Sequence, residues 1–289
     1  MKVKVYTLNA FSKIENGGNP AGVVLDADFL SESEMQHIAK IVGFSETAFV
    51  QKSNSADFRV KFFTPHGEVD LCGHATIATF YLLAYKGIID NGEYTQETKA
   101  GLLKVENHKN ETIYMYQNKP IFYEIIDKNE VSDSLNVNES VILNNFPTQI
   151  VSTGLKDIFI PISSLEELHC IKPDFDKIIS ISRKYGVIGY HLFTLDTVHN
   201  SIAHCRNFAP LYDITEEAAT GTSTGALACY LYKYGIISED ATKQLVFEQG
   251  YSMQRPSEIL AGLSVLKKEV LEVKVGGVAK GINEIIIEV

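Results

Sequence analysis

The sequence predicts an α+β fold of two pseudo-symmetric lobes, each a curved sheet wrapped around a central buried helix. The first observation is a repeat, because residues 73–89 (GHATIATFYLLAYKGII) return without a gap as residues 221–237 (GTSTGALACYLYKYGII). The second is that both copies are apolar nearly all round, so each helix must be enclosed by its lobe. The third is a similar order of elements ahead of each copy. Two lobes that face each other leave a cleft, which is where small ligands usually bind.

The first lobe begins with an alternating strand and a loop rich in turn formers at residues 12–20. Ser31 stands three residues before Glu34, which is the capping-box spacing, and Gly43 follows the apolar stripe of the helix that this spacing predicts. Further strands are predicted at 22–25, 47–51 and 58–63, ahead of the enclosed helix at 73–86.

The second lobe repeats this order, and the polar segment 127–140 is interpreted as the link between the lobes. Strands are predicted at 149–151, 157–161, 190–196 and 203–208, with a helix at 175–185 that ends at Gly186. We expect residues 1–120 to form the N-terminal lobe and 121–277 the C-terminal lobe. The final strand, from about 278 to 289, is expected to return to the first lobe.

Composition excludes several classes of function. A net charge of −10 without a local Lys/Arg cluster argues against nucleic acid as a partner. The longest apolar run, residues 77–85, is too short to span a bilayer, and the N-terminus lacks a signal-peptide core. Four scattered cysteines without a C-x-x-C pair are typical of reduced thiols in the cytoplasm. His199 lies close to His204 and Cys205, which stand on a predicted strand, and these residues are interpreted as core or surface positions, so no metal site is expected.

Both enclosed helices begin with a glycine that is followed by small or polar residues, namely His74 and Ala75 after Gly73, and Thr222 and Ser223 after Gly221. Free backbone N–H groups at a helix start form an anion site, which could hold a carboxylate or an enolate without a metal. The alternative is that these residues only cap two helices. The density of donors in residues 220–225 favours substrate binding over capping alone.

Glu46 stands between a capped helix and a strand, flanked by apolar residues. A carboxylate among apolar groups has a raised pKa and can exchange protons near neutrality. The alternative, a solvent-exposed glutamate at an element junction, is the default, and the residues alone favour it.

Three further groups lie near the helix starts. His74 can donate a proton or a hydrogen bond, or simply cap its helix. Cys72 can serve as a thiolate base at a helix N-terminus, although a lone cysteine is more often a small buried hydrophobic residue. Glu216 and Glu217 precede the second helix, and their role could be no more than complementing its dipole.

Six motifs in order give the chain a resemblance to the PhzF-like isomerase family, which is related to diaminopimelate epimerase and proline racemase. The motifs are residues 18–24 (GNPAGVV), 45–49 (SETAF), 62–65 with 73–76 (FFTP, GHAT), 206–210 (RNFAP), 217–222 (EAATGT), and 248–250 with 253–257 (EQG, MQRPS). The resemblance covers essentially the whole chain.

The resemblance implies the diaminopimelate epimerase-like fold, in which each lobe is a barrel-like, mostly antiparallel sheet around a helix, with the site between the lobes. It also implies a homodimer, a small-molecule substrate and no cofactor. The proton-shuttling glutamate of the family matches Glu46, which reverses the preference stated above, and its site histidine matches His74. Its substrate-positioning aspartate falls at Glu217 and a serine falls at Thr222, so the identity of the substrate does not carry over.

Three functions follow as hypotheses. The first is a cofactor-independent isomerase that uses Glu46, His74 and Glu217, with Cys72, Gly73, Gly221, Thr222 and Ser223 binding the substrate. The second is a cysteine-dependent epimerase or racemase that uses Cys72, although the relatives of that kind have two cysteines and this chain has Thr220 at the second position. The third is a non-catalytic protein that binds small acids. Proton carriers on only one of the two repeats favour isomerisation over racemisation.

Overall fold

The computed structural model describes residues 1–289, and the chain forms two compact units. Unit 1 comprises Met1–Tyr116 and Gly276–Val289, and unit 2 comprises Gln117–Val275. None of the helices has both the length and the apolar character needed to cross a membrane.

Unit 1 contains two helices, eight complete strands and most of a ninth. In chain order these are β1 (Lys2–Ala10), β2 (Asn19–Val24), α1 (Glu32–Val42), β3 (Thr47–Gln51), β4 (Phe58–Phe63), β5 (Glu68–Val69), α2 (Gly73–Tyr85), β6 (Gly92–Thr98), β7 (Gly101–Asn107), β8 (Ile113–Gln117) and β18 (Ala279–Glu288). The C-terminal strand β18 pairs antiparallel with β1.

Unit 2 holds the remaining elements. They are β9 (Ile121–Ile125), α3 (Lys128–Ser134), β10 (Gln149–Ser152), β11 (Lys156–Pro161), α4 (Leu165–Cys170), α5 (Phe175–Tyr185), β12 (Gly189–Thr194), β13 (Ala203–Ala209), β14 (Ile214–Glu217), α6 (Gly221–Lys233), β15 (Leu245–Gln249), β16 (Ser257–Leu266) and β17 (Glu269–Gly277). Four short 3₁₀ helices complete the chain.

The two units share one pattern of strand pairing. In unit 1 the pairs β1–β2, β3–β4 and β6–β7 are antiparallel, whereas β2–β3 and β4–β6 are parallel. In unit 2 the pairs β10–β11, β12–β13 and β15–β16 are antiparallel, whereas β11–β12 and β13–β15 are parallel. The predicted fold class, α+β with two pseudo-symmetric lobes of curved, mostly antiparallel sheet, is confirmed.

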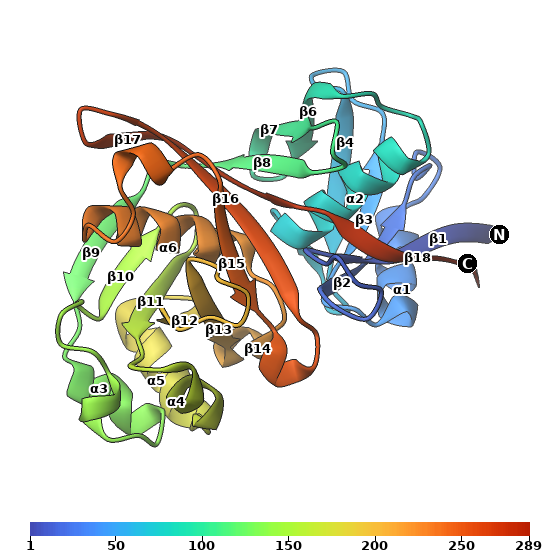
Figure 1. The fold of residues 1–289 in the computed structure, drawn as a ribbon. Helices are drawn as coiled ribbons and strands as arrows, with labels where there is room; N and C mark the ends of the chain where they lie inside the picture. The colour runs from blue at the N-terminus through green and yellow to red at the C-terminus, as the bar shows by residue number, and fades with distance from the viewer. The chain divides into compact units, whose positions relative to one another are not determined.

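A buried helix lies against the sheet of each unit (Figure 1). Helix α2 packs against β1, β2, β3 and β7, and every residue from His74 to Leu83 is buried. Helix α6 packs against β10, β11 and β16, and every residue from Ser223 to Leu231 is buried. Both helices are apolar on all sides because the curved sheet leaves no face for solvent.

Helix α1 begins as its sequence predicts. Ser31 accepts from the Glu34 backbone N–H while the Glu34 side chain accepts from the Ser31 backbone, and Gly43 ends the helix in the left-handed conformation at φ 70°. The apolar stripe, which includes Met35 and Ile38, packs into the core of unit 1.

The polar segment 127–140 does not link the lobes, so that prediction was wrong. Residues 128–134 form α3, and Val131 and Leu135 lie fully buried in the core of unit 2. These two residues are four positions apart and therefore occupy one face of the helix, while polar side chains cover the rest. The boundary between the compact units instead falls within β8, after Tyr116.

Candidate active site

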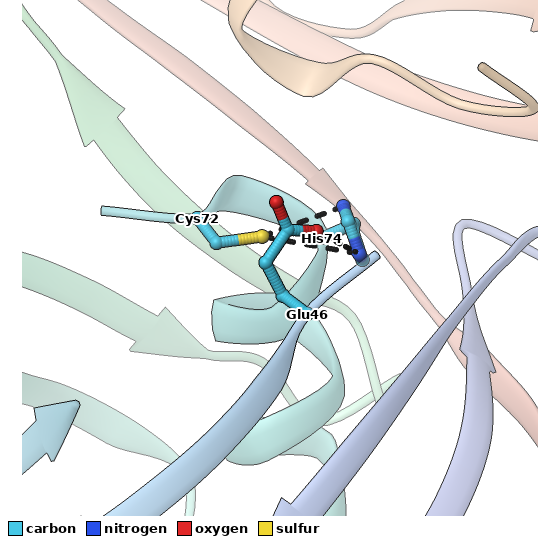
Figure 2. A group of neighbouring side chains, drawn as sticks. All are labelled: Glu46, Cys72 and His74. Carbon is cyan, nitrogen blue, oxygen red and sulfur yellow. Dashed lines mark hydrogen bonds and ion pairs between the residues drawn. The ribbon is translucent and has the colours of Figure 1, made fainter. Parts of the chain in front are cut away.

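Three of the predicted site residues, Glu46, Cys72 and His74, lie together in unit 1 (Figure 2). Glu46 immediately precedes β3, and Cys72 and His74 flank the first residue of α2, which packs against β3. The Glu46 Oε2 atom lies 3.3 Å from His74 Nε2. The Cys72 Sγ atom lies 3.5 Å from Nδ1 and 3.8 Å from Nε2 of the same ring.

The cluster is largely shielded from water. The side chains of His74 and Glu46 are 4% and 14% exposed, and Cys72 is 7% exposed. Burial lowers the pKa of His74, and the nearby Glu46 carboxylate only partly opposes that shift. The imidazole is therefore neutral at neutral pH.

Asn19, the first residue of β2, favours one tautomer of that neutral ring. Its Nδ2 atom lies 3.2 Å from His74 Nδ1. Because an amide NH₂ group only donates, Nδ1 is the acceptor and Nε2 carries the proton, an assignment that follows from the hydrogen-bond network. The Nε2–H group then faces the Glu46 carboxylate and the Ser45 hydroxyl, whose oxygen lies 3.4 Å away.

Glu46 differs from an ordinary ion-pair partner in one respect. Its Oε2 atom is buried and makes no hydrogen bond, although it is within ion-pair distance of His74. The two atoms are thus within ion-pair distance but outside hydrogen-bond geometry, so the contact is electrostatic rather than a formed hydrogen bond. A buried carboxylate oxygen that accepts no hydrogen bond keeps its lone pair available for a proton.

The start of α2 adds a positive potential beside the cluster. Cys72 occupies the N-cap position but makes no side-chain capping bond. The first helical bond runs from Thr76 N to Cys72 O at 3.0 Å, so the N–H groups of Gly73, His74 and Ala75 have no acceptor within the helix. Such a helix start favours a negatively charged group.

The start of α6 repeats this geometry within unit 2. Thr220 is the N-cap, again without a side-chain capping bond, and Thr224 donates to Thr220 O from its backbone N at 3.0 Å and from Oγ1 at 2.9 Å. In α2, Thr76 likewise donates to Cys72 O from both its backbone N and its Oγ1. The carbonyl oxygens of Gly221 and Thr222 accept from Gln117 and Thr153, at 3.1 and 3.2 Å.

Of the two glutamates before α6, Glu217 lies next to the helix start. Its Oε2 atom accepts from Thr220 Oγ1 at 2.6 Å, and Gln249 Nε2 bridges the Glu217 carbonyl and the Thr220 hydroxyl at 2.7 and 3.0 Å. Glu216 instead forms a two-pronged ion pair with Arg206, at 2.8 and 2.9 Å. Glu216 therefore has a structural partner on β13 and does not complement the α6 dipole alone.

Ser223 lies in the interior of unit 2. It is 2% exposed, and its hydroxyl donates to Asp157 Oδ2 at 2.5 Å, so only its backbone N–H stays a candidate for substrate binding. Asp157 is a group that sequence reasoning missed. Burial raises the pKa of Asp157 to about 6, against the hydrogen bonds from Ser223 and the Gly189 N–H, and its Oδ1 atom has no partner.

The two groups that sequence reasoning missed, Asn19 and Asp157, differ in the signal they left. Asn19 lies inside the GNPAGVV motif at residues 18–24, which the resemblance already singled out, although its pairing with His74 is seen only in the structure. Asp157 and its partner Ser223 are far apart in the chain, on β11 and α6, and neither stands in a recognisable catalytic pattern.

Comparison with known proteins gives a consistent set of relatives. The model of a family described as phenazine biosynthesis-like protein, PhzC-PhzF, matches residues 8–284. An uncharacterized isomerase of Clostridium acetobutylicum is 36% identical over 286 residues, covering 96% of this chain and 95% of that protein. The trans-2,3-dihydro-3-hydroxyanthranilate isomerase of Pseudomonas chlororaphis is 28% identical over 277 residues, covering 93% and 94%.

Solved structures agree with these matches. The Bacillus anthracis phenazine biosynthesis protein of the PhzF family superposes with a TM-score of 0.91 at 31% identity, covering 100% of both chains. A hydroxyproline epimerase from Agrobacterium vitis has a TM-score of 0.63 at 10% identity, covering 99% of this chain and 92% of that one. The second likeness shows a common fold alone.

Proposed function

Because the chain belongs to the PhzC-PhzF family of phenazine biosynthesis-like proteins, we propose that it is a cofactor-independent isomerase in which Glu46 moves a proton within a small, carboxylate-bearing metabolite. The observation that carries this proposal is the buried Glu46–His74 pair beside the uncapped start of α2. Named relatives, including the enzyme of Pseudomonas chlororaphis, are isomerases.

The proposed reaction needs two proton transfers and no net change in atoms or electrons. The Glu46 carboxylate takes a proton from a carbon next to an activating group, and the electron pair of that C–H bond moves into the activating group. The resulting Glu46 carboxylic acid returns the proton to another carbon of the same substrate. The His74 Nε2–H group and the first N–H groups of α2 stabilise the negative charge that develops between the two steps.

A second candidate is a thiol-dependent epimerase, and the position of the Cys72 Sγ atom 3.5 Å from His74 Nδ1 supports it. In that reaction Cys72, with His74 as its partner, would exchange the proton at a stereocentre. The equivalent N-cap of α6 is Thr220, whose hydroxyl donates a hydrogen bond to Glu217. This commitment of the hydroxyl makes Thr220 a poor second base and leaves the two-base reaction incomplete.

The test is hydrogen exchange in heavy water. The protein is incubated in D₂O with trans-2,3-dihydro-3-hydroxyanthranilate and, separately, with a metabolite extract, and deuterium uptake is followed by mass spectrometry. We expect Glu46→Gln to lower the exchange rate roughly 10²–10⁴-fold, which is the usual contribution of general acid/base catalysis. The matched control is Glu68→Gln, which alters a carboxylate of β5 in the same unit and should leave the rate unchanged.

Each outcome assigns the chemistry. Exchange that survives in Glu46→Gln but is lost in Cys72→Ser would replace the isomerase with the thiol-dependent epimerase. A ligand that binds tightly but never exchanges hydrogen would indicate a binding protein without catalysis. The roles of Glu217, Gly221, Thr222 and Ser223 in substrate binding, the homodimer and the cytoplasmic location stay predictions.

A further inference from the structure

We propose that Glu46, Cys72 and His74 form a zinc-binding site, and that Zn²⁺ at this site is a reversible inhibitor. The metal-binding part of this inference stands on the geometry of unit 1 alone. The inhibitory part rests on the proposed function, because it requires Glu46 to be the proton carrier.

The ligand atoms are already close to the spacing that zinc needs. A tetrahedral zinc ion has ligand bonds of about 2.0–2.3 Å, which places neighbouring ligand atoms about 3.3–3.6 Å apart. Glu46 Oε2 and His74 Nε2 are 3.3 Å apart, and Cys72 Sγ lies 3.8 Å from the same nitrogen. All three ligand atoms lie within 4.8 Å of one another, and Figure 2 shows the sulfur and the carboxylate both beside the imidazole.

The chemistry of the donors selects the metal. Thiolate, imidazole and carboxylate are all zinc ligands, whereas Mg²⁺ and Ca²⁺ prefer oxygen alone. Two anionic ligands match the charge of a divalent ion, and the uncapped start of α2 favours negative charge on the Cys72 sulfur. Three protein ligands leave a fourth position open for water or a substrate carboxylate.

Two further observations favour a bound cation. The Glu46 Oε2 atom is buried without a hydrogen-bond donor, so it keeps an unfilled acceptor 3.3 Å from the ring nitrogen. Asn19 faces the opposite nitrogen of the His74 ring at 3.2 Å. When Nε2 binds a metal the proton moves to Nδ1, and the Asn19 amide, by turning over, can accept a hydrogen bond from Nδ1–H as the outer partner that metal-bound histidines usually have.

Inhibition follows from the same contacts. Zinc bound to Glu46 occupies the oxygen that would accept the substrate proton, and zinc bound to Nε2 replaces the N–H group that would stabilise the developing charge. The isomerase would then be off while zinc is bound and active again once a chelator removes it.

The experiment titrates the full-length, reduced protein with Co²⁺ as a spectroscopic substitute for zinc. We expect a thiolate-to-cobalt charge-transfer band that saturates at one equivalent, disappears when Zn²⁺ is added and does not form with Mg²⁺. Cys72→Ser should abolish the band, because the band requires a thiolate ligand. It should also weaken zinc binding by at least roughly 10–100-fold, since loss of a residue that only hydrogen-bonds to a metal ligand already costs that much. Serine is a preferred N-cap residue, so this variant keeps the start of α2.

Two controls test other groups in unit 2. Cys170→Ser removes an exposed cysteine, and His169→Ala breaks the pair in which the Nε2 atoms of His169 and His204 lie 3.1 Å apart. Both variants should bind cobalt and zinc as the wild type does. A band that is absent in the wild type, or that survives in Cys72→Ser, overturns the proposed metal site. A band that behaves as expected, in a protein that never exchanges substrate hydrogen, supports the metal site and refutes the isomerase.

Discussion

The Oε2 atom of Glu46 lies 3.3 Å from the Nε2 atom of His74, in a setting where both side chains are mostly buried. Because burial lowers the pKa of His74, this is a carboxylate facing a neutral imidazole rather than a full ion pair. Asn19 donates to Nδ1 on the far side of the ring, and this hydrogen bond favours the tautomer in which Nε2 carries the proton. Asn19 would thus influence, through the far side of the His74 ring, which proton the pair can use.

The variant Asn19→Asp should reverse the tautomer of His74. A carboxylate at residue 19 only accepts, so it draws the proton to Nδ1 and raises the pKa of the imidazole. We expect ¹⁵N NMR of His74 to change from an Nε2–H to an Nδ1–H or doubly protonated pattern, and hydrogen exchange to fall roughly 10–100-fold.

Asn16→Asp adds the same charge in the preceding exposed loop and should change neither the spectrum nor the rate. An unchanged Nε2–H pattern in Asn19→Asp would show that Asn19 does not set the tautomer.

Asp157 should make unit 2 less stable as pH rises through the weakly acidic range. Its pKa is raised from 3.8 to about 6 in the folded protein, so the folded state binds the proton more tightly than the unfolded state. This contribution is fully present below pH 3.8 and is lost as pH rises through about 6, a loss of about 3 kcal/mol. His191 acts in the opposite direction, because burial lowers its pKa to about 3.

The comparison of Asp157→Asn with wild type cancels the contribution of His191. Asparagine keeps an acceptor for the Ser223 hydroxyl but does not titrate, so its stability relative to wild type should increase by about 2 kcal/mol between pH 4 and pH 8, most of the full effect, because the unfolded aspartate is already largely ionised at pH 4. Urea unfolding at the two pH values measures this change. Asp240→Asn, at an exposed position, is the control and should show no such trend. A difference between Asp157→Asn and wild type that is the same at both pH values would contradict the raised pKa.

Thr220→Val should destabilise the start of α6. The Thr220 hydroxyl donates to Glu217 Oε2 at 2.6 Å and accepts from Gln249 Nε2 at 3.0 Å, and valine leaves both groups without this partner. We expect a loss of about 1–3 kcal/mol in the free energy of unfolding, measured by urea titration. Thr220→Ser keeps the hydroxyl and should cost less. Equal losses in the two variants would show that the hydroxyl and its hydrogen bonds contribute no more to stability than the methyl group does.

The elements that could be predicted from the sequence are those whose signals are local. The helix starts of α1 and α5 carry a capping residue and a terminal glycine, and the composition of α2 and α6 alone requires enclosure. The strands β6 and β7 were missed because most of their side chains are not buried, and no apolar alternation marks them. The two strands instead pair with each other as a hairpin, with Thr98 opposite Gly101, and β6 also pairs in parallel with β4.

The candidate site divides in the same way. His74 and Gly73 are visible as a helix start, whereas a glutamate at an element junction is by default solvent-exposed, and only the family resemblance reversed that interpretation of Glu46. The Asp157–Ser223 pair could not be predicted, because it joins the first turn of α6 to a strand far away in the chain. Such a contact exists only once β11 and α6 are packed together, so no local pattern encodes it.

Gly189 should tolerate no side chain, although its backbone is not left-handed. A Cβ atom at this position would lie 1.9 Å from the Phe208 carbonyl oxygen and 2.9 Å from the Ala209 Cα atom, and both belong to the neighbouring strand β13. Backbone atoms held in a sheet cannot move aside as a flexible side chain can, so Gly189→Ala should cost at least the roughly 1–3 kcal/mol typical of overpacking. Gly154→Ala is the matched control in the same unit, since no atom lies within 4 Å of the place that its added methyl group would occupy. That variant should be neutral or more stable by about 0.4–1 kcal/mol, because alanine restricts the unfolded chain. Urea unfolding of the two variants measures the contrast, and equal stabilities would show that β12 and β13 can separate at Gly189 without penalty.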